Sequence, residues 1–254
     1  MLLRAALMWA VAAAIHGAHA DETAALYQAS WAGLPAGEIR LTLRDDPAVY
    51  RGEIVIRTEG LPRLLTRFRA SAVSEGRLAA ESLPAPIRYD AVYDLRKRRD
   101  RRLSMRFAQR AGAVVAERGP EDTSKKPPLA EEFRSNVLDP LSALAAIRHA
   151  LRRGERGAFT LPVYDGARRF DVLVRVGPKR AGDTVLHLAL ILSPIAGFKG
   201  GGEDGDPDDA PRPVLLTISD DQRLMPLSMS VSLGYLPLVV ELSGWCGAAA
   251  PCPW

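Results

Sequence analysis

The stretch EIRLTLRDDPAVYRGEIVIR, residues 38–57, alternates apolar and polar side chains on either side of a short turn. One face carries Ile39, Leu41 and Leu43 before the turn and Tyr50, Gly52, Ile54 and Ile56 after it. Asp45-Asp46-Pro47 is a typical turn sequence. A period of two residues places alternate side chains on opposite faces of a β-strand. The stretch therefore predicts two antiparallel strands that share one apolar face.

The same alternation recurs over most of the chain. A hairpin is predicted with Tyr89, Ala91, Tyr93 and Leu95 on one strand, Leu103, Met105 and Phe107 on the next, and the basic run Arg96–Arg102 at its tip. Further strands are expected at 68–73, 159–164, 170–176, 185–192, 214–219, 227–233 and 238–242. Residues 117–128 are polar and contain proline, which predicts an exposed loop. We therefore predict a mainly β fold in a single domain, whose antiparallel sheet has about ten or eleven strands.

One segment, residues 139–152, breaks the β pattern with alanine and leucine at helical spacing. Asp139 is a good N-cap and Pro140 suits the first helical turn. Gly154 supplies the stop. The predicted buried stripe is Leu141, Leu144, Ile147 with Arg148, and Leu151. This is the one substantial helix that we expect outside the N-terminal segment.

Residues 1–20 have the composition of a cleavable secretory signal. Arg4 precedes an apolar run at 5–15, and Ala18-His19-Ala20 has small residues at the two recognition positions. The run is far shorter than the ~20 residues of a membrane-spanning helix, and no cysteine that would carry a lipid follows it. We expect cleavage after Ala20 and a soluble periplasmic protein.

The charge balance and the cysteine content narrow the classes of function and of binding site that the sequence allows. The chain has 34 lysines and arginines against 30 aspartates and glutamates, a balance that does not suggest a nucleic-acid partner. Cys246 and Cys252 are the two cysteines, and in an oxidising compartment we expect them to form a local disulfide. A metal site there lacks a third ligand nearby, so no metal is predicted. The predicted divisions are a signal peptide at 1–20, a β domain at 21–243 and a tail at 244–254.

Three stretches together resemble a bacterial secreted family, the domain of unknown function DUF3108. They are the GLPAG stretch at residues 33–37 after Tyr27 and Trp31, LDPLSAL at 138–144, and DGARRF at 165–170. The resemblance spans about residues 25 to 242. It implies an envelope protein with a large, strongly curved sheet, an open or half barrel, around an apolar groove, similar to the periplasmic lipoprotein carriers. It brings no catalytic residues. The tail and the acidic stretch 197–209 are not part of it.

Motifs for catalysis and cofactors are missing from the sequence. We find no G-x-S-x-G, H-E-x-x-H or phosphate-binding loop, and we predict neither an enzyme nor a cofactor. Asp204, Asp206 and Asp208 are spaced like the start of a calcium loop. The match fails because Asp209 replaces the glycine of the sharp turn and Leu215 stands where a glutamate is needed. His149 is interpreted as an ordinary helix histidine.

Candidate binding residues come from the strands and from the hairpin tip. The residues expected to line a groove are Trp31, Tyr89, Tyr93, Phe107 and His187. Aromatic residues on an alternating strand are also common core residues, and for His187 a hydrogen-bonded core histidine is the more common interpretation. Arg98, Arg99, Arg101 and Arg102 are the candidate contacts to an anionic surface such as phospholipid head groups. The alternative for this run is a solvated hairpin tip.

These observations favour one function and leave two others open. The first is a non-enzymatic periplasmic binding protein for an apolar or amphipathic envelope ligand such as an acyl chain. The second is an accessory or scaffold protein that contacts envelope proteins through the basic tip and the tail. The third is a hydrolase that uses His187 with a nearby carboxylate.

Overall fold

The computed structural model describes residues 21–46, 48–60, 63, 67–79, 83–95, 98–198, 210–233, 236–247 and 252–254. The predicted signal peptide at 1–20 and the aspartates Asp204, Asp206 and Asp208 lie outside the described residues. Within the described part, the predicted mainly β architecture with one substantial helix is confirmed.

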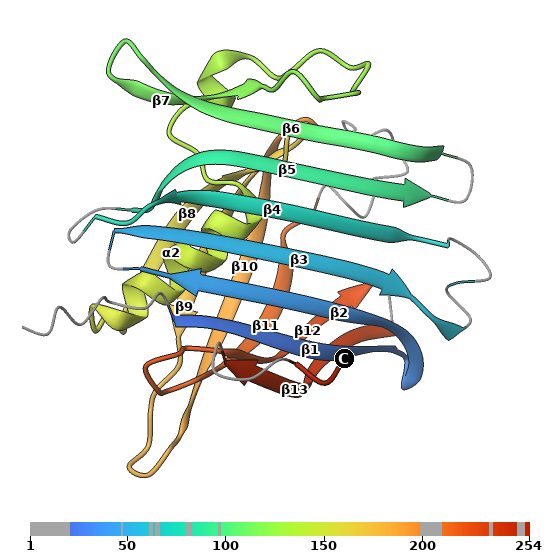
Figure 1. Ribbon diagram of the computed structural model, residues 1–254. Helices are drawn as coiled ribbons and strands as arrows, with labels where there is room; N and C mark the ends of the chain where they lie inside the picture. The colour runs from blue at the N-terminus through green and yellow to red at the C-terminus, as the bar shows by residue number, and fades with distance from the viewer. Residues whose placement is uncertain are drawn as a thin grey trace, which may run out of the picture.

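All strands belong to one 13-stranded sheet (Figure 1). The strands are β1 (Asp21–Trp31), β2 (Leu34–Asp45), β3 (Val49–Thr58), β4 (Arg69–Arg77), β5 (Ala85–Leu95), β6 (Arg98–Arg110), β7 (Ala113–Arg118), β8 (Ala158–Tyr164), β9 (Arg169–Val176), β10 (Val185–Ala196), β11 (Arg212–Ser219), β12 (Pro226–Leu233) and β13 (Leu236–Gly247). Their order is β7-β6-β5-β4-β3-β2-β1-β13-β12-β11-β10-β9-β8, with antiparallel neighbours. Two antiparallel meanders, β1–β7 and β8–β13, are therefore joined where β1 pairs with β13.

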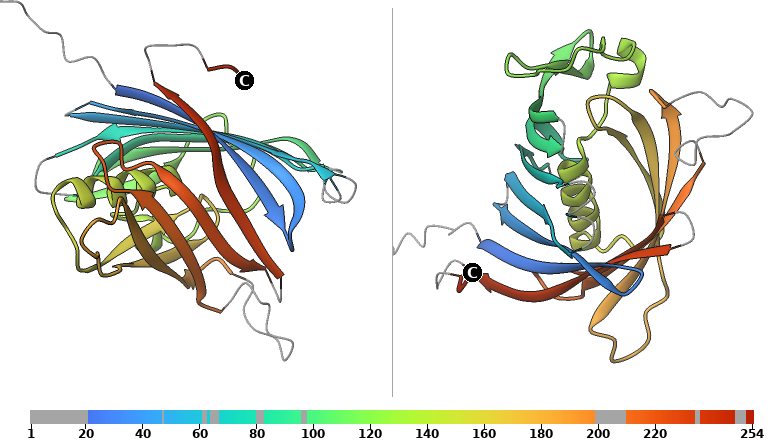
Figure 2. Two further views of the ribbon diagram at one scale, coloured as in Figure 1. Left: turned by 90° about the horizontal axis from the view of Figure 1, so that it is seen from below. Right: turned by 90° about the vertical axis from the view of Figure 1, so that its right-hand side faces the viewer.

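The sheet curves so strongly that its two halves face each other with the helix α2 (Pro140–Arg152) between them (Figure 2). β7 and β8 are the two edges, so the sheet is open. The segment before α2 nevertheless touches both edges: Val115 of β7 is bridged to Ser135, and Leu138 is bridged to Val163 of β8. A short 3-10 helix, η1 (Glu131–Arg134), leads into this segment.

The sheet has at least two strands more than the ten or eleven that the sequence predicts. The two additional strands, β1 and β7, have only a weak alternation of apolar residues. β1 alternates mainly through small or polar residues such as Thr23 and Ala25, which carry little apolar signal. β7 ends at Arg118, inside the stretch 117–128 that we predicted as a loop. β7 is stabilised as a strand by its pairing with β6, and its short local pattern does not reveal this partner.

The N-terminus of α2 is fastened to the sheet by a buried polar cluster, which we call the Asp139 cluster: Asp139, Ser142, Ser74 and Tyr50. Asp139 is fully buried and caps the helix, accepting the backbone N–H groups of Leu141 and Ser142 at 3.0 Å each. Its other carboxylate oxygen accepts the hydroxyl groups of Ser142 and of Ser74, the latter at 2.9 Å.

Tyr50 of β3 completes the cluster, with its hydroxyl 2.5 Å from Ser142 Oγ. Burial raises the pKa of Asp139, although the hydrogen bonds oppose this shift. The predicted N-cap and the first-turn proline are thus confirmed, and Asp139 and Ser142 also hold the helix against β3 and β4.

The other end of α2 is held by Arg148, which belongs to the predicted stripe and is 3% exposed. Its guanidinium Nη1 lies 2.7 Å from Asp45 Oδ2, and its Nη2 and Nε donate to the carbonyls of Arg223 and Leu224 at 2.6 and 3.2 Å. Asp45 also pairs with Arg152 at 2.5 Å. Both ends of the helix are therefore tied by polar contacts, while its middle faces apolar side chains.

The main core lies between α2 and the second meander. Its fully buried side chains include Leu161, Val174, Leu188 and Ile218 from the strands, with Ile147 from the helix. A second core cluster forms under β4–β7 and contains Tyr89, Met105 and Val137.

β13 continues past the predicted domain boundary at residue 243 and ends at Gly247, because β1 offers it backbone partners up to the pair Thr23 and Gly247. Cys246 therefore lies in β13. It is joined to Cys252 by a disulfide, with the two Cα atoms 5.6 Å apart. The disulfide ties the last residues to the end of the strand.

Candidate functional site: an apolar cavity

A cavity of about 400 Å³ lies between the concave face of the sheet and α2. Its wall is almost wholly apolar and draws on both meanders and the helix. The lining residues are Tyr27, Ile39, Leu41, Ile54, Pro140, Leu141, Ala143, Leu144, Ile147, Val163, Phe170, Val172, Leu190, Leu192, Val214, Leu216, Pro226, Ser228, Met229 and Val240. Its volume falls in the ~300–1,000 Å³ range of small-molecule sites.

The cavity follows from the strand register and from the position of the helix. Tyr27 of β1 pairs with Ile39 of β2, and both side chains line the cavity. Leu141 and Leu144 on α2 are only half-buried, although they belong to the apolar stripe of the helix. The cavity is therefore the space that remains between the helix and the strands β1 and β2.

The hydroxyl group of Tyr27 in the wall already has its hydrogen-bond partner. Tyr27 donates its hydroxyl to the carbonyl of Pro226 at 2.9 Å and lies 3.3 Å from Met225 Sδ, so its ring faces the cavity as an apolar surface. Burial raises the pKa of Tyr27 and keeps it neutral. Apolar cavities of this kind hold no ordered water and accept apolar guests.

None of the five residues predicted to line a groove is among the lining residues of this cavity. Tyr89, Tyr93 and Phe107 are on the concave side but pack into the neighbouring core cluster with Leu103 and Val137. They belong to β5 and β6, which contribute no residue to the wall of the cavity.

Trp31 lies at the end of β1 and is 37% exposed. It sits beside Leu34 at the turn to β2 and pairs with Leu238 of β13. Leu34 and Leu236, which open β2 and β13, are exposed as well. Trp31 therefore belongs to an exposed apolar rim rather than to the cavity wall.

The prediction that His187 faces inward is wrong, because the alternate face of β10 carries the core. Leu186, Leu188 and Leu190 are buried, whereas His187 is exposed and its Nδ1 lies 3.3 Å from Thr217 Oγ1. β10 is apolar on both faces, so the sequence pattern alone does not distinguish the buried side.

The basic run lies at the tip of the predicted hairpin, and most of it is strand rather than turn. Arg98 and Arg99 already belong to β6, whereas their side chains lie outside the described residues. Arg101 pairs with Tyr93 and Arg102 with Val92 across the β5–β6 ladder. The strand is extended because the backbone of Arg102 bonds on its other side to Thr123, with N–H to Oγ1 at 2.9 Å and C=O to N–H at 2.9 Å.

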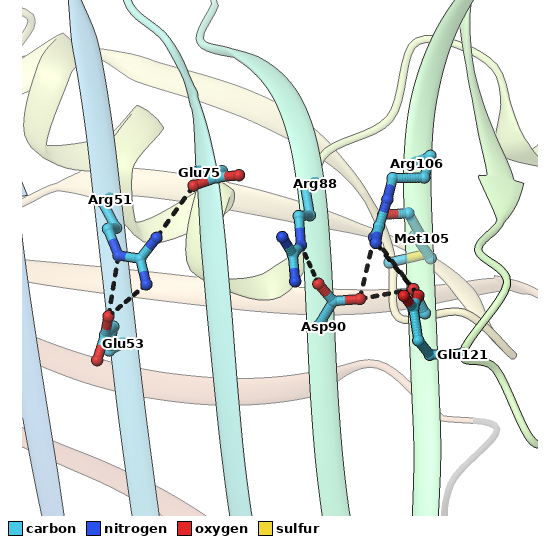
Figure 3. Close-up of polar contacts among 9 residues, drawn as sticks. Arg51, Glu53, Glu75, Arg88, Asp90, Met105, Arg106 and Glu121 are labelled. Atoms are coloured by element: carbon cyan, nitrogen blue, oxygen red, sulfur yellow. Dashed lines mark hydrogen bonds and ion pairs between the residues drawn. The ribbon is translucent and has the colours of Figure 1, made fainter.

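The outer face of β3–β6 carries ion pairs within and between neighbouring strands (Figure 3). Asp90 is at the centre of one group: it accepts from Arg88, from Arg106 Nη1 at 3.0 Å and from Ser104 Oγ at 2.5 Å. Arg51 forms another group, with Glu53 at 2.7 Å and Glu75 at 3.1 Å. These contacts lie away from the cavity and serve strand pairing.

Replacing Asp90 with asparagine should lower the free energy of unfolding by about 1–2 kcal/mol at pH 7. Burial opposes ionisation of Asp90, but the bonds from Ser104, Arg88 and Arg106 lower its pKa below the ordinary value. Its stabilising contribution is thus present above the unfolded pKa of ~3.9 and lost as the pH falls through the lower folded pKa. Urea unfolding of both proteins at pH 7 and pH 3 measures this. If the difference in the free energy of unfolding between the two proteins is the same at pH 7 and pH 3, ionised Asp90 does not stabilise the fold in this way. Glu53→Gln, which changes an exposed carboxylate, is the control.

Two kinds of feature are absent from the described residues. No helix there is long and apolar enough to cross a membrane. No group of three or more histidine, cysteine, aspartate or glutamate side chains there is arranged to hold a metal ion.

The open, curved sheet with an internal helix and an apolar cavity defines a half-barrel protein. Residues 26–242 match the family described as "Protein of unknown function (DUF3108)", and the chain belongs to that family. Its fold is similar to the crystal structure of a β-barrel-like protein of the domain of unknown function DUF1849 from Brucella abortus. The two share 11% identity with a TM-score of 0.56, over 90% of this chain and 98% of that one. No curated protein matches the sequence.

Proposed function

We propose that the protein is a non-enzymatic periplasmic carrier or sensor that holds the acyl chain of an envelope amphiphile in the apolar cavity. The observation that supports this most directly is the cavity itself, about 400 Å³ in volume and walled by side chains of both meanders and α2. Burying a chain there gains ~0.8 kcal/mol per CH2 group. The periplasmic location rests on the predicted signal peptide.

The arginines near the start of β6 add a membrane-contacting surface to the proposal. Arg101 and Arg102 lie at the same end of the sheet as Trp31 and Leu34, because β1 and β5 both end there and β2 and β6 begin there. Exposed apolar and cationic side chains at one end suit contact with an anionic membrane surface, from which the chain would be taken.

Titration with a neutral long-chain fluorescent probe tests the cavity. The purified protein should bind one probe per chain, and an unlabelled fatty alcohol should displace it. Binding that fails to saturate, or that the alcohol does not reverse, would speak against a defined cavity and favour surface adsorption. In that case, the exposed apolar rim around Trp31 would be tested next. A pull-down assay would show whether an envelope protein binds there.

A further inference from the structure

The outer face of β3 and β4 carries two arginines directly opposite each other, which we call the arginine pair. Arg57 of β3 and Arg69 of β4 are register partners, and both side chains are exposed. The N–H group of Thr58 donates to the carbonyl of Phe68 at 3.1 Å, so the adjacent arginine pair is a non-hydrogen-bonded pair of the antiparallel ladder. In such a pair the Cβ atoms are only ~4.5–5.5 Å apart. The two guanidinium groups can therefore reach one small anion together.

Carboxylates neutralise another arginine of this face, but they do not neutralise the arginine pair. Arg51 of β3 pairs with Glu53 at 2.7 Å and with Glu75 of β4 at 3.1 Å (Figure 3). In the described part of the chain, neither guanidinium group of the arginine pair has an ion-pair or hydrogen-bond partner. Like charges directly opposite each other destabilise a sheet. Strand pairing therefore does not explain why both positions are arginine.

The carboxylates closest in register to the arginine pair have other partners. Glu38 of β2 lies opposite the β3 member of the pair, and it accepts from Arg40 Nε at 2.9 Å. Asp94 of β5 lies opposite the β4 member, and its Oδ1 accepts the backbone N–H group of Asp100 at 2.8 Å. Both acids therefore leave the guanidinium groups of the arginine pair available to a ligand.

The two connections at this end of the sheet are basic. Residues 59–68, between the two arginines of the pair, contain two further arginines and one acid, Glu59. Residues 96–102, at the tip of the β5–β6 hairpin, contain six basic residues and one acid, Asp100. These counts include every residue of the two connections, so no further carboxylate of these segments offsets the charge. The end of the sheet around the arginine pair therefore has a surplus of positive charge.

We propose that the arginine pair binds the phosphate group of an anionic phospholipid when this end of the sheet rests on a membrane. This inference rests on the proposed function, to which it adds the lipid group that is recognised and the residues that recognise it. Guanidinium groups match a phosphate with parallel N–H donors. The exposed apolar side chains of Trp31 and Leu34 lie at the same end of the sheet, so one contact brings both to the bilayer surface. Binding the phosphate also relieves the repulsion between the two arginines.

Binding to vesicles tests the arginine pair. The purified protein, Arg57→Gln, Arg69→Gln and the double variant are sedimented with vesicles of phosphatidylcholine alone or mixed with phosphatidylglycerol. Each single substitution should weaken binding to the mixed vesicles about fivefold, and the double variant about thirtyfold. None of the proteins should bind the pure phosphatidylcholine vesicles as tightly as the unaltered protein binds the mixed ones.

The matched control is Arg88→Gln. It removes the same charge from the same outer face, but Arg88 is paired with Asp90 and lies near the start of β5, at the other end of the sheet. Binding to the mixed vesicles should change less than twofold. If Arg88→Gln weakens binding as strongly as Arg57→Gln, net charge alone drives the contact and the arginine pair is not a site.

Thermal unfolding separates a binding role from a structural one. Arg57→Gln removes a like-charge repulsion, so its melting temperature should equal or exceed that of the unaltered protein. A lower melting temperature with unchanged vesicle binding would assign the arginine pair to the fold and overturn the proposal.

Two further measurements separate this inference from the proposed function. The double variant should bind the neutral long-chain probe as the unaltered protein does. If the unaltered protein binds the probe but ignores the mixed vesicles, or if inorganic phosphate occupies the arginine pair when vesicles do not, the membrane contact alone is overturned. Failure of the unaltered protein to bind the probe overturns the proposed function and this inference with it.

Discussion

Replacing Asp139 with alanine is expected to lower the free energy of unfolding by about 3 kcal/mol. Loss of the helix N-cap costs ~1 kcal/mol. The buried hydroxyls of Ser74 and Ser142 also lose their acceptor, which costs ~1–3 kcal/mol. For a domain of this size the melting temperature should fall by roughly 6–12 °C. Calorimetry or circular dichroism measures the change directly.

Asparagine at the same position gives the matched comparison. Its side-chain oxygen still caps the helix, and it carries no charge. Because burial raises the pKa of Asp139 in the folded protein, stability falls as the pH rises above the unfolded pKa of ~3.9, where the unfolded carboxyl group ionises first, and asparagine avoids that loss. Asp139→Asn should therefore cost clearly less than Asp139→Ala. Glu53→Ala removes an exposed ion pair with Arg51 and should cost less than about 1 kcal/mol. Equal losses for all three variants would show that the Asp139 cluster does not hold the helix.

Replacing Leu144 with tryptophan should weaken binding of a long-chain probe by about sixtyfold. Leu144 is half-buried on α2 and lines the cavity. The indole fills space that about three CH2 groups of a ligand would occupy, each worth ~0.8 kcal/mol on burial. The sum of ~2.4 kcal/mol corresponds to that factor in Kd. Fluorescence titration of both proteins with the same probe gives the ratio.

The control for this change is Leu215→Trp. Leu215 lies on β11 between two cavity-lining residues but points outward, with 63% of its surface exposed. It introduces the same side chain without entering the cavity, so affinity should stay within about twofold. If Leu215→Trp weakens binding as strongly as Leu144→Trp, the probe binds elsewhere.

Local patterns were sufficient to predict most elements of the fold. The alternation at 38–57 became β2 and β3, and the capping residues around 139–152 defined α2. β1 was not predicted from its pattern because its small residues carry little apolar signal. Its place in the sheet depends on pairing with β2 and with β13, the latter more than two hundred positions away in sequence. The side of β10 that His187 occupies was decided by the core, because the buried residues Leu186, Leu188 and Leu190 lie on the other face.

The site was less predictable than the fold, for a physical reason. A cavity is a gap in packing, and its wall here is made of residues that look like ordinary core, such as Leu41, Leu190 and Val240. Sequence reasoning instead selected aromatic residues and histidine, and the structure places these in a neighbouring core, on a rim or on the outer face. The useful signal was the helix stripe at Leu141 and Leu144, which does line the cavity.

The central claim is that the cavity holds an acyl chain, and mass spectrometry under native conditions tests it most directly. The protein would be isolated gently from the periplasm of its native cells, weighed intact, and then extracted with organic solvent. We expect a defined mass excess that is lost on extraction and recovered as a lipid, and that is absent from the Leu144→Trp variant. A protein that is empty as isolated and stays empty after incubation with lipids would contradict it.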